Sequence, residues 1–162
     1  MQTPSDAIVK ALAVSQALLD RYTADLKGQE FLHRTSPTAN CAAWTIGHLT
    51  LSDRNVLKRM GVRDLPPLPD GFEKRFSRDE GCPQAGDFGD PATLMPIFHQ
   101  HRQRLIDVVK NSTTEQLNKP LDKPFPLFST VGEMALFMAT HVAMHAGQIT
   151  LIRRSLGRPP LV

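Results

Sequence analysis

Residues 130–157 read TVGEMALFMATHVAMHAGQITLIRRSLG, and this segment has the clearest helical pattern in the chain. Thr130 and Glu133 have the spacing of a capping box, in which each side chain bonds the other residue's backbone N–H at the start of a helix. Gly157 and the two prolines after it are typical of a helix end. The spacing therefore predicts a helix over 130–156 with one inward face, formed by Val131, Met134, Met138, His141, His145, Ile149 and Ile152.

Three further helices are predicted upstream. The first, near 3–27, begins with Thr3 as its N-cap, and its inward face holds Ile8, Leu12, Ser15, Leu19, Tyr22 and Leu26. The second, near 40–60, is placed mainly by its ends, with Asn40 as the cap and Gly61 as the stop. The third, near 91–111, has a face of Leu94, Phe98, His101, Leu105 and Val108. No segment has a convincing strand pattern.

The helical pattern breaks over residues 65–90, which are rich in proline and glycine. Helical bundles use long connections of this kind to cross over, so that consecutive helices run parallel. Phe72, Phe76 and Phe88 are expected to pin such a crossover against the bundle or to line the mouth of a pocket. The sequence predicts an all-α fold, a single domain over 1–162 built as a four-helix bundle with a crossover between its second and third helices.

Composition excludes several classes of function. The chain has 162 residues and a net charge of +3, and its basic residues are scattered among acidic ones rather than focused in one stripe. Nucleic-acid binding is therefore not expected. The N-terminus lacks the basic and apolar regions of a leader, and no window approaches the ~20 apolar residues of a membrane span. We expect a cytoplasmic protein without a membrane partner, and Cys41 and Cys82 fit no disulfide framework.

Three histidines are the candidate functional residues. His141 and His145 are four positions apart, so they lie one turn apart on the same helix face. His48 lies in another predicted helix and can supply a third imidazole. From spacing alone two interpretations stay open, a pair of neutral core imidazoles or a shared metal ion. Three imidazoles would leave an open coordination position, as in reactive metal sites.

Other polar residues are candidates for supporting roles. Gln148 can reach the environment of His145, and Trp44 shares the face of His48. His101 is the inward member of the pair His99 and His101, and it is a candidate neighbour of the site, whereas His99 is expected to face solvent. His33 receives no role. Cys41 lies two turns from His48, about 10.5 Å along the helix axis, so the two cannot bind one ion.

Two motifs resemble a known family. Trp44-x-x-Gly47-His48-Leu49, followed by His141-x-x-x-His145-x-Gly147-Gln148-Ile149, is similar to the DinB-like superfamily, which includes the YfiT-like proteins. The resemblance implies an up-down-down-up four-helix bundle, commonly dimeric. It also implies one divalent metal ion held by His48, His141 and His145. Relatives with a known activity use low-molecular-weight thiols such as bacillithiol or mycothiol, as S-transferases or as an isomerase of maleylpyruvate.

The resemblance favours a metal-dependent transferase that uses a small thiol. A non-catalytic metal-binding or dimerisation module and a metal-dependent hydrolase are the alternatives. Zinc is the first choice of ion, and nickel, iron or copper would also suit imidazole ligands. Hydrolysis is ranked lower because no second carboxylate or serine is expected on the histidine faces, and Asp53 is expected to point away from His48. Off-seam residues suggest a homodimer formed by helix faces: Ala7, Ala11, Leu18, Leu136 and Phe137.

Overall fold

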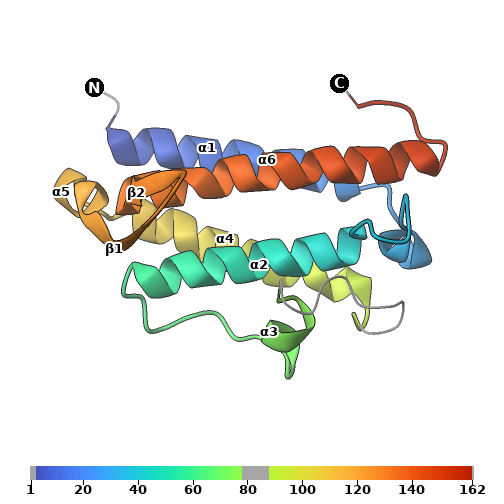
Figure 1. Ribbon diagram of the computed structural model, residues 1–162, viewed down its shortest axis with the longest axis horizontal. Coiled ribbons are helices and arrows are strands. Elements are labelled where there is room, and N and C mark those ends of the chain that lie inside the picture. Colours follow the sequence, from blue (N-terminus) through green and yellow to red (C-terminus); the bar gives the residue numbers. More distant parts are fainter. Residues whose placement is uncertain (1–2, 78–87, 162) are drawn as a thin grey trace.

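The computed structural model describes residues 3–77 and 88–161, and in that part of the chain four long helices dominate (Figure 1). They are α1 (Pro4–Thr23), α2 (Ala42–Arg59), α4 (Leu94–Lys110) and α6 (Val131–Ser155). The predicted N-cap at Thr3 and the predicted capping box of Thr130 and Glu133 are both present and begin α1 and α6, and Thr3 also forms a capping box with Asp6. The shorter elements are η1 (Gly28–Leu32), α3 (Phe72–Arg75), η2 (Pro91–Thr93), α5 (Thr114–Asn118), β1 (Pro120–Phe125) and β2 (Phe128–Thr130).

The four long helices form an up-down-down-up bundle. Figure 1 shows α1 and α6 side by side and running in the same direction, with α2 and α4 running the opposite way beneath them. The connection between α2 and α4 therefore returns along the length of the bundle and carries α3. The all-α bundle and its crossover are confirmed, although residues 78–87 of the predicted 65–90 link, with Cys82, lie outside the described residues.

The crossover is held by aromatic side chains. Phe72, Phe76 and Phe88 are all buried, and their rings contact one another in sequence. Phe76 packs against the backbone of α2 at Gly47, where an added Cβ would collide with the phenyl ring. Gly47 is therefore the residue that lets the crossover pack closely on the helix that carries His48.

The core follows most of the predicted seam positions, although on α4 Val109 is buried and the predicted Val108 is not, and it also encloses charged side chains. All six residues predicted for the inward face of the first helix are buried. Between α2 and α4, however, Asp53 and Arg102 form a bidentate ion pair of 2.7 and 2.9 Å, with side chains 1% and 0% exposed. Arg102 also donates to the hydroxyl of Ser15 on α1. This pair joins three helices of the bundle, and it agrees with the expectation that Asp53 points away from His48.

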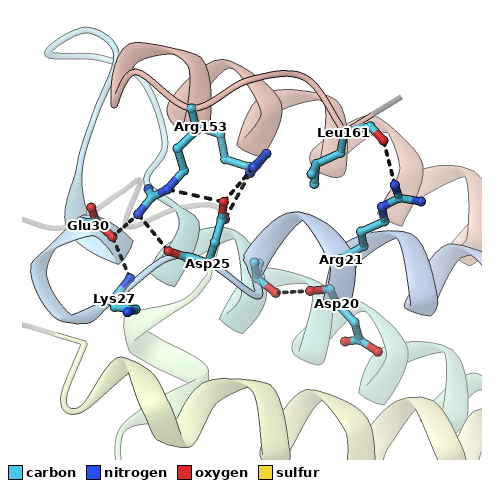
Figure 2. Close-up of polar contacts among 9 residues, drawn as sticks. Asp20, Arg21, Asp25, Lys27, Glu30, Arg153 and Leu161 are labelled. Atoms are coloured by element: carbon cyan, nitrogen blue, oxygen red, sulfur yellow. Dashed lines mark hydrogen bonds and ion pairs between the residues drawn. The ribbon is translucent and has the colours of Figure 1, made fainter.

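Ion pairs fix the C-terminal end of α6 to the segment after α1 (Figure 2). Arg153, which is almost fully buried, binds the carboxylate of Asp25 with a shortest distance of 2.7 Å. Arg158 binds Asp25 and also reaches Glu30 at 2.7 Å. Glu30 in turn accepts from the backbone N–H of Lys27. The register of α6 along α1 is therefore set at this end by charged contacts.

Two local predictions are wrong. β1 and β2 form an antiparallel hairpin where no strand was expected, with Pro120 opposite Thr130 and Phe125 opposite Phe128. The hairpin escaped detection because its strands are short and mostly exposed, so they lack the alternation that burial of one face imposes. The N-cap of α2 is Cys41 rather than Asn40, and no side-chain bond caps the helix. Helix α2 instead begins where Cys41 and Ala42 become buried in the core.

Helix α6 corrects one expectation about membranes. Among the described residues it is the one helix whose length and composition would allow it to cross a bilayer. The sequence was expected to contain no such segment. The core helix of a helical bundle can have the same length and apolar composition. The packing of α6 against α1 and α2 accounts for its apolar character.

Candidate metal centre

Two neighbouring helices bring the three histidines together. His48 comes from the middle of α2, and His141 and His145 come from successive turns of α6. One ring nitrogen from each residue lies within 4.8 Å of the other two. The ring centroids are 4.8 to 5.3 Å apart, and His48 is buried while the other two are partly exposed. These three imidazoles form one cluster, which we call the histidine cluster.

The donor atoms fit a divalent transition metal. The Nε2 atoms of His141 and His145 are 3.1 Å apart. A tetrahedral ion with metal–nitrogen bonds of about 2.0–2.1 Å holds two ligand nitrogens about 3.3 Å apart, which is close to this separation. Three neutral nitrogen donors match the preference of zinc, nickel, copper and iron for imidazole. The histidine cluster can therefore hold one such ion.

Gln148 orients one of the candidate ligands. Its Oε1 lies 2.9 Å from Nδ1 of His145. An amide oxygen can only accept, so Nδ1 of His145 carries the proton and Nε2 presents its lone pair to the cluster. Ligating histidines characteristically donate their second N–H to an oxygen in this way. The structure thus places Gln148 beside the cluster, in the supporting position that its spacing suggested.

Aromatic rings hold the other two imidazoles. The indole of Trp44 stacks on His48 with ring centroids 4.8 Å apart and an interplanar angle of 4°. The ring of Phe137 lies nearly parallel to that of His141, at 5.9 Å and 12°. Ser52 donates its hydroxyl to the carbonyl oxygen of His48. Ser52 also corrects an expectation, because it stands on the His48 face where no serine was predicted.

The remaining histidines lie elsewhere. His101 is fully buried, its Nδ1 donates to the carbonyl of Ile97, and its Nε2 lies 3.3 Å from the guanidinium of Arg54. Burial holds the pKa of His101 below its ordinary value. These contacts assign it to the interface of α4 with α2, and it does not belong to the group of candidate ligands. His99 contacts Asp20, and His33 contacts Ser155.

A cavity opens beside the histidine cluster, and we call it the α2–α6 cavity. Its volume is about 540 Å³. From α2 it is lined by residues that include Trp44, His48, Ser52, Asn55, Val56 and Arg59. From α6 and the hairpin it is lined by Phe125, Leu127, Phe128, Met134, Phe137, Met138, His141, Met144 and His145. A smaller hollow of about 380 Å³ lies against His48 on the side of the crossover, lined in part by Lys58, Glu73 and Phe76.

Sequence reasoning missed the hairpin's share of this cavity. Phe125, Leu127 and Phe128 lie in a proline-broken segment between the third and fourth predicted helices, for which the sequence predicts neither helix nor strand. Only their apolar character in an otherwise polar connection could have signalled a role. The hairpin matters to the site because it closes one side of the α2–α6 cavity.

Comparison with known proteins gives one positive result. The model of the DinB superfamily matches residues 11–149, a span of 139 of the 162 residues. The span includes the whole histidine cluster and Gln148. No curated protein matches the chain.

Proposed function

Because the chain belongs to the DinB superfamily, we propose that it is a metal-dependent transferase that uses a low-molecular-weight thiol of the bacillithiol or mycothiol type. The observation that carries the proposal is the opening of three convergent imidazoles onto a cavity of about 540 Å³. A structural zinc site is usually closed by four protein ligands, whereas three ligands beside a cavity leave room for a reactant. Zinc is the ion proposed first, with nickel, iron or copper as alternatives.

The residues of the chain have separable roles in this proposal. His48, His141 and His145 would hold the ion, and Gln148 keeps His145 in the tautomer that ligation requires. A divalent ion held by neutral ligands supplies positive charge, which lowers the pKa of a nearby thiol. In the transfer, the thiol S–H bond breaks and its proton leaves to solvent, the thiolate sulfur forms a bond to an electrophilic carbon of the second substrate, and the bond from that carbon to its leaving group, a halide in an aryl halide, breaks as the leaving group departs with the electron pair.

The lining of the cavity favours a thiol over water as the nucleophile. Hydrolysis profits from a general base, and no aspartate or glutamate is found among the described residues that line the α2–α6 cavity. Asp53, the acidic residue nearest to His48 in sequence, is buried against Arg102. The Ser52 hydroxyl is engaged by the carbonyl of His48. A thiol needs less assistance because its intrinsic pKa is much lower than that of water.

Metal analysis of purified protein tests the first half of the proposal. After chelation and reloading, the wild type should retain about one equivalent of zinc or nickel. The variants His48→Ala, His141→Ala and His145→Ala should each lose most of it. His99→Ala is the matched control, because His99 is a histidine bound to Asp20 outside the cluster. Equal metal content in His145→Ala and the wild type would contradict the assignment.

A kinetic comparison tests the second half. The metal-loaded protein is mixed with an activated aryl halide and each of several small thiols, and separately with an activated ester. We expect conjugation that depends on both metal and thiol. Ester hydrolysis without any rate gain from a thiol would instead support the hydrolase. Tight metal binding with neither activity would support a non-catalytic metal-binding module.

Assembly and location complete the proposal. We propose a homodimer, supported by the large exposed apolar side chains of Val14, Leu136 and Leu151 on the paired helices α1 and α6. Of the off-seam residues considered earlier, Phe137 contacts the tilted ring of Phe128 and stacks on His141 within its own chain, so it lines the cavity instead. Light scattering that returns a mass close to 18.0 kDa at high concentration would reject the dimer. The scattered charges support the absence of a nucleic-acid partner, and the packing of α6 against α1 and α2 supports a cytoplasmic protein without a membrane partner.

A further inference from the structure

We propose that the α2–α6 cavity takes an elongated amphipathic anion, with an aromatic or alkyl body along the hairpin side and a carboxylate at Arg59. The inference rests on the proposed function only for the chemistry at the histidine end of this ligand. The shape, the apolar wall and the charge of the cavity carry the rest.

The apolar wall is a continuous series of aromatic rings. Phe125 contacts Phe128 at 5.1 Å between centroids, Phe128 contacts Phe137 at 5.3 Å, and Phe137 stacks on His141 at 5.9 Å. The series therefore runs from the hairpin to the histidine cluster. Met134 and Met138 line the same part of the cavity, and thioethers adapt readily to flat rings and alkyl chains.

The exposed part of this wall indicates that it is built for a ligand. Phe125 is 48% exposed and Leu127 is 65% exposed, although both line the cavity. Soluble proteins seldom display neighbouring large apolar side chains without a binding role. A small molecule lying along the wall would cover both of them.

The charge of the lining selects an anion. Among the described residues that line the cavity, none is acidic, and Arg59 is the cationic side chain. Arg59 lies in the last turn of α2 and is exposed, and no ion pair within the described part of the chain engages it. A metal ion at the histidine cluster would add further positive charge. Both ends of the cavity would therefore attract negative charge, while the wall from the hairpin and α6 is apolar and the α2 side between the ends carries Ser52, Asn55 and Val56.

The spacing sets the length of the ligand. Arg59 follows His48 by eleven residues, which is about 16 Å along the axis of α2. The flexible Arg59 side chain and the imidazole ring each shorten the gap that a ligand must bridge. A phenyl ring joined to a carboxylate by a short alkyl chain has suitable dimensions and chemistry.

Calorimetric titration with a matched pair of probes tests this inference. The probes are 6-phenylhexanoate and its neutral analogue 6-phenylhexan-1-ol, titrated into the full chain after metal removal and again after zinc loading. We expect the carboxylate to bind about fivefold more tightly than the alcohol, the preference expected from one exposed ion pair. Arg59→Gln should remove this preference without weakening the alcohol. Arg154→Gln, which alters an exposed arginine near the end of α6, is the matched control and should preserve it.

A second variant tests the apolar wall. Phe128→Ala should weaken both probes by a similar factor and leave their ratio unchanged, because it removes ring contacts and no charge. Equal affinity for the two probes in the wild type, an unchanged carboxylate affinity in Arg59→Gln, or no measurable binding of either probe would each overturn the inference. Titration of the metal-free protein separates this inference from the proposed function, because carboxylate preference without metal retention would reject only the latter.

Discussion

The indole ring of Trp44 lies flat against the imidazole of His48, with ring centroids 4.8 Å apart and planes within 4° of parallel. Trp44 is the one tryptophan in the sequence. Because both rings come from the same helix one turn apart, the stack fixes the orientation in which His48 faces α6. A residue that orients a ligand without touching the ion commonly influences metal affinity by 10- to 100-fold.

Trp44→Ala is expected to lower zinc affinity by about tenfold, whereas Trp44→Phe should retain most of it because a phenyl ring can still stack. Competition with a chromogenic chelator measures both constants. In the wild type, nickel or copper binding should also change the tryptophan emission. Equal affinities in Trp44→Ala and the wild type would show that His48 is oriented by other contacts.

The buried pair of Asp53 and Arg102 predicts a large effect on stability. Asp53→Asn leaves the guanidinium of Arg102 buried without its counter-charge, so we expect a loss of about 3 kcal/mol in the free energy of unfolding. Asp64→Asn is the control, because Asp64 pairs with Arg104 at the surface, where water and salt screen the pair, and its loss should change stability little. Urea denaturation of the metal-free variants measures both. A similar small loss in the two variants would contradict the structural role of the buried pair.

His101 predicts a dependence of stability on pH. Burial lowers its pKa in the folded protein, the charge of Arg54 acts in the same direction, and Asp53 opposes them. In the unfolded chain the pKa returns to about 6.5. The unfolded state therefore binds more protons between the two values, and stability present above about pH 6.5 is lost as the pH falls toward the folded pKa.

Comparing His101→Gln with the wild type isolates this effect. The variant should be less stable near neutral pH, because the contacts to Ile97 and Arg54 are altered. Its stability should nevertheless fall less steeply as the pH drops below about 6.5. Denaturant unfolding of metal-free protein at several pH values provides the two slopes. Identical slopes would show that His101 does not titrate differently in the two states.

Alanine substitutions at two helical glycines are expected to change stability in opposite directions. Gly47→Ala places a methyl group into the ring of Phe76, so we expect a loss of about 1–3 kcal/mol in stability. Gly147→Ala meets no atom within 4 Å and replaces glycine inside α6, so it should stabilise the protein by up to about 1 kcal/mol. Thermal unfolding ranks the two variants. If Gly47→Ala were as stable as the wild type, the crossover would have to pack less closely on α2.

Local sequence patterns correctly predicted the features that depend on the residues of one helix alone. The seams of α1 and α6 and the proximity of His141 to His145 follow from the period of 3.6 residues, and the capping box of α6 follows from the spacing of Thr130 and Glu133. That period identifies an inward side but not which residue of another helix lies opposite. His101 was therefore considered near the site, although it faces Arg54 of α2.

The features that the sequence did not reveal are those that depend on contacts between different helices and strands. Whether His48 stands opposite His141 depends on the offset between α2 and α6, and only the family resemblance supplied it before the structure. The hairpin residues Phe125 and Phe128 could not be assigned to the cavity from the sequence, because their positions depend on how a short, exposed pair of strands lies over the bundle.

The up-down-down-up arrangement also determines the order in which the protein can mature during synthesis. Helix α1 packs chiefly on α6, the last helix of the described chain. The first helix therefore leaves the ribosome long before its principal neighbour exists, and closing this pair requires contacts between distant parts of the sequence. His48 is likewise synthesised long before His141 and His145. A nascent chain that ends before α6 should bind no metal through this cluster, so metal capture becomes a late step that follows completion of the bundle.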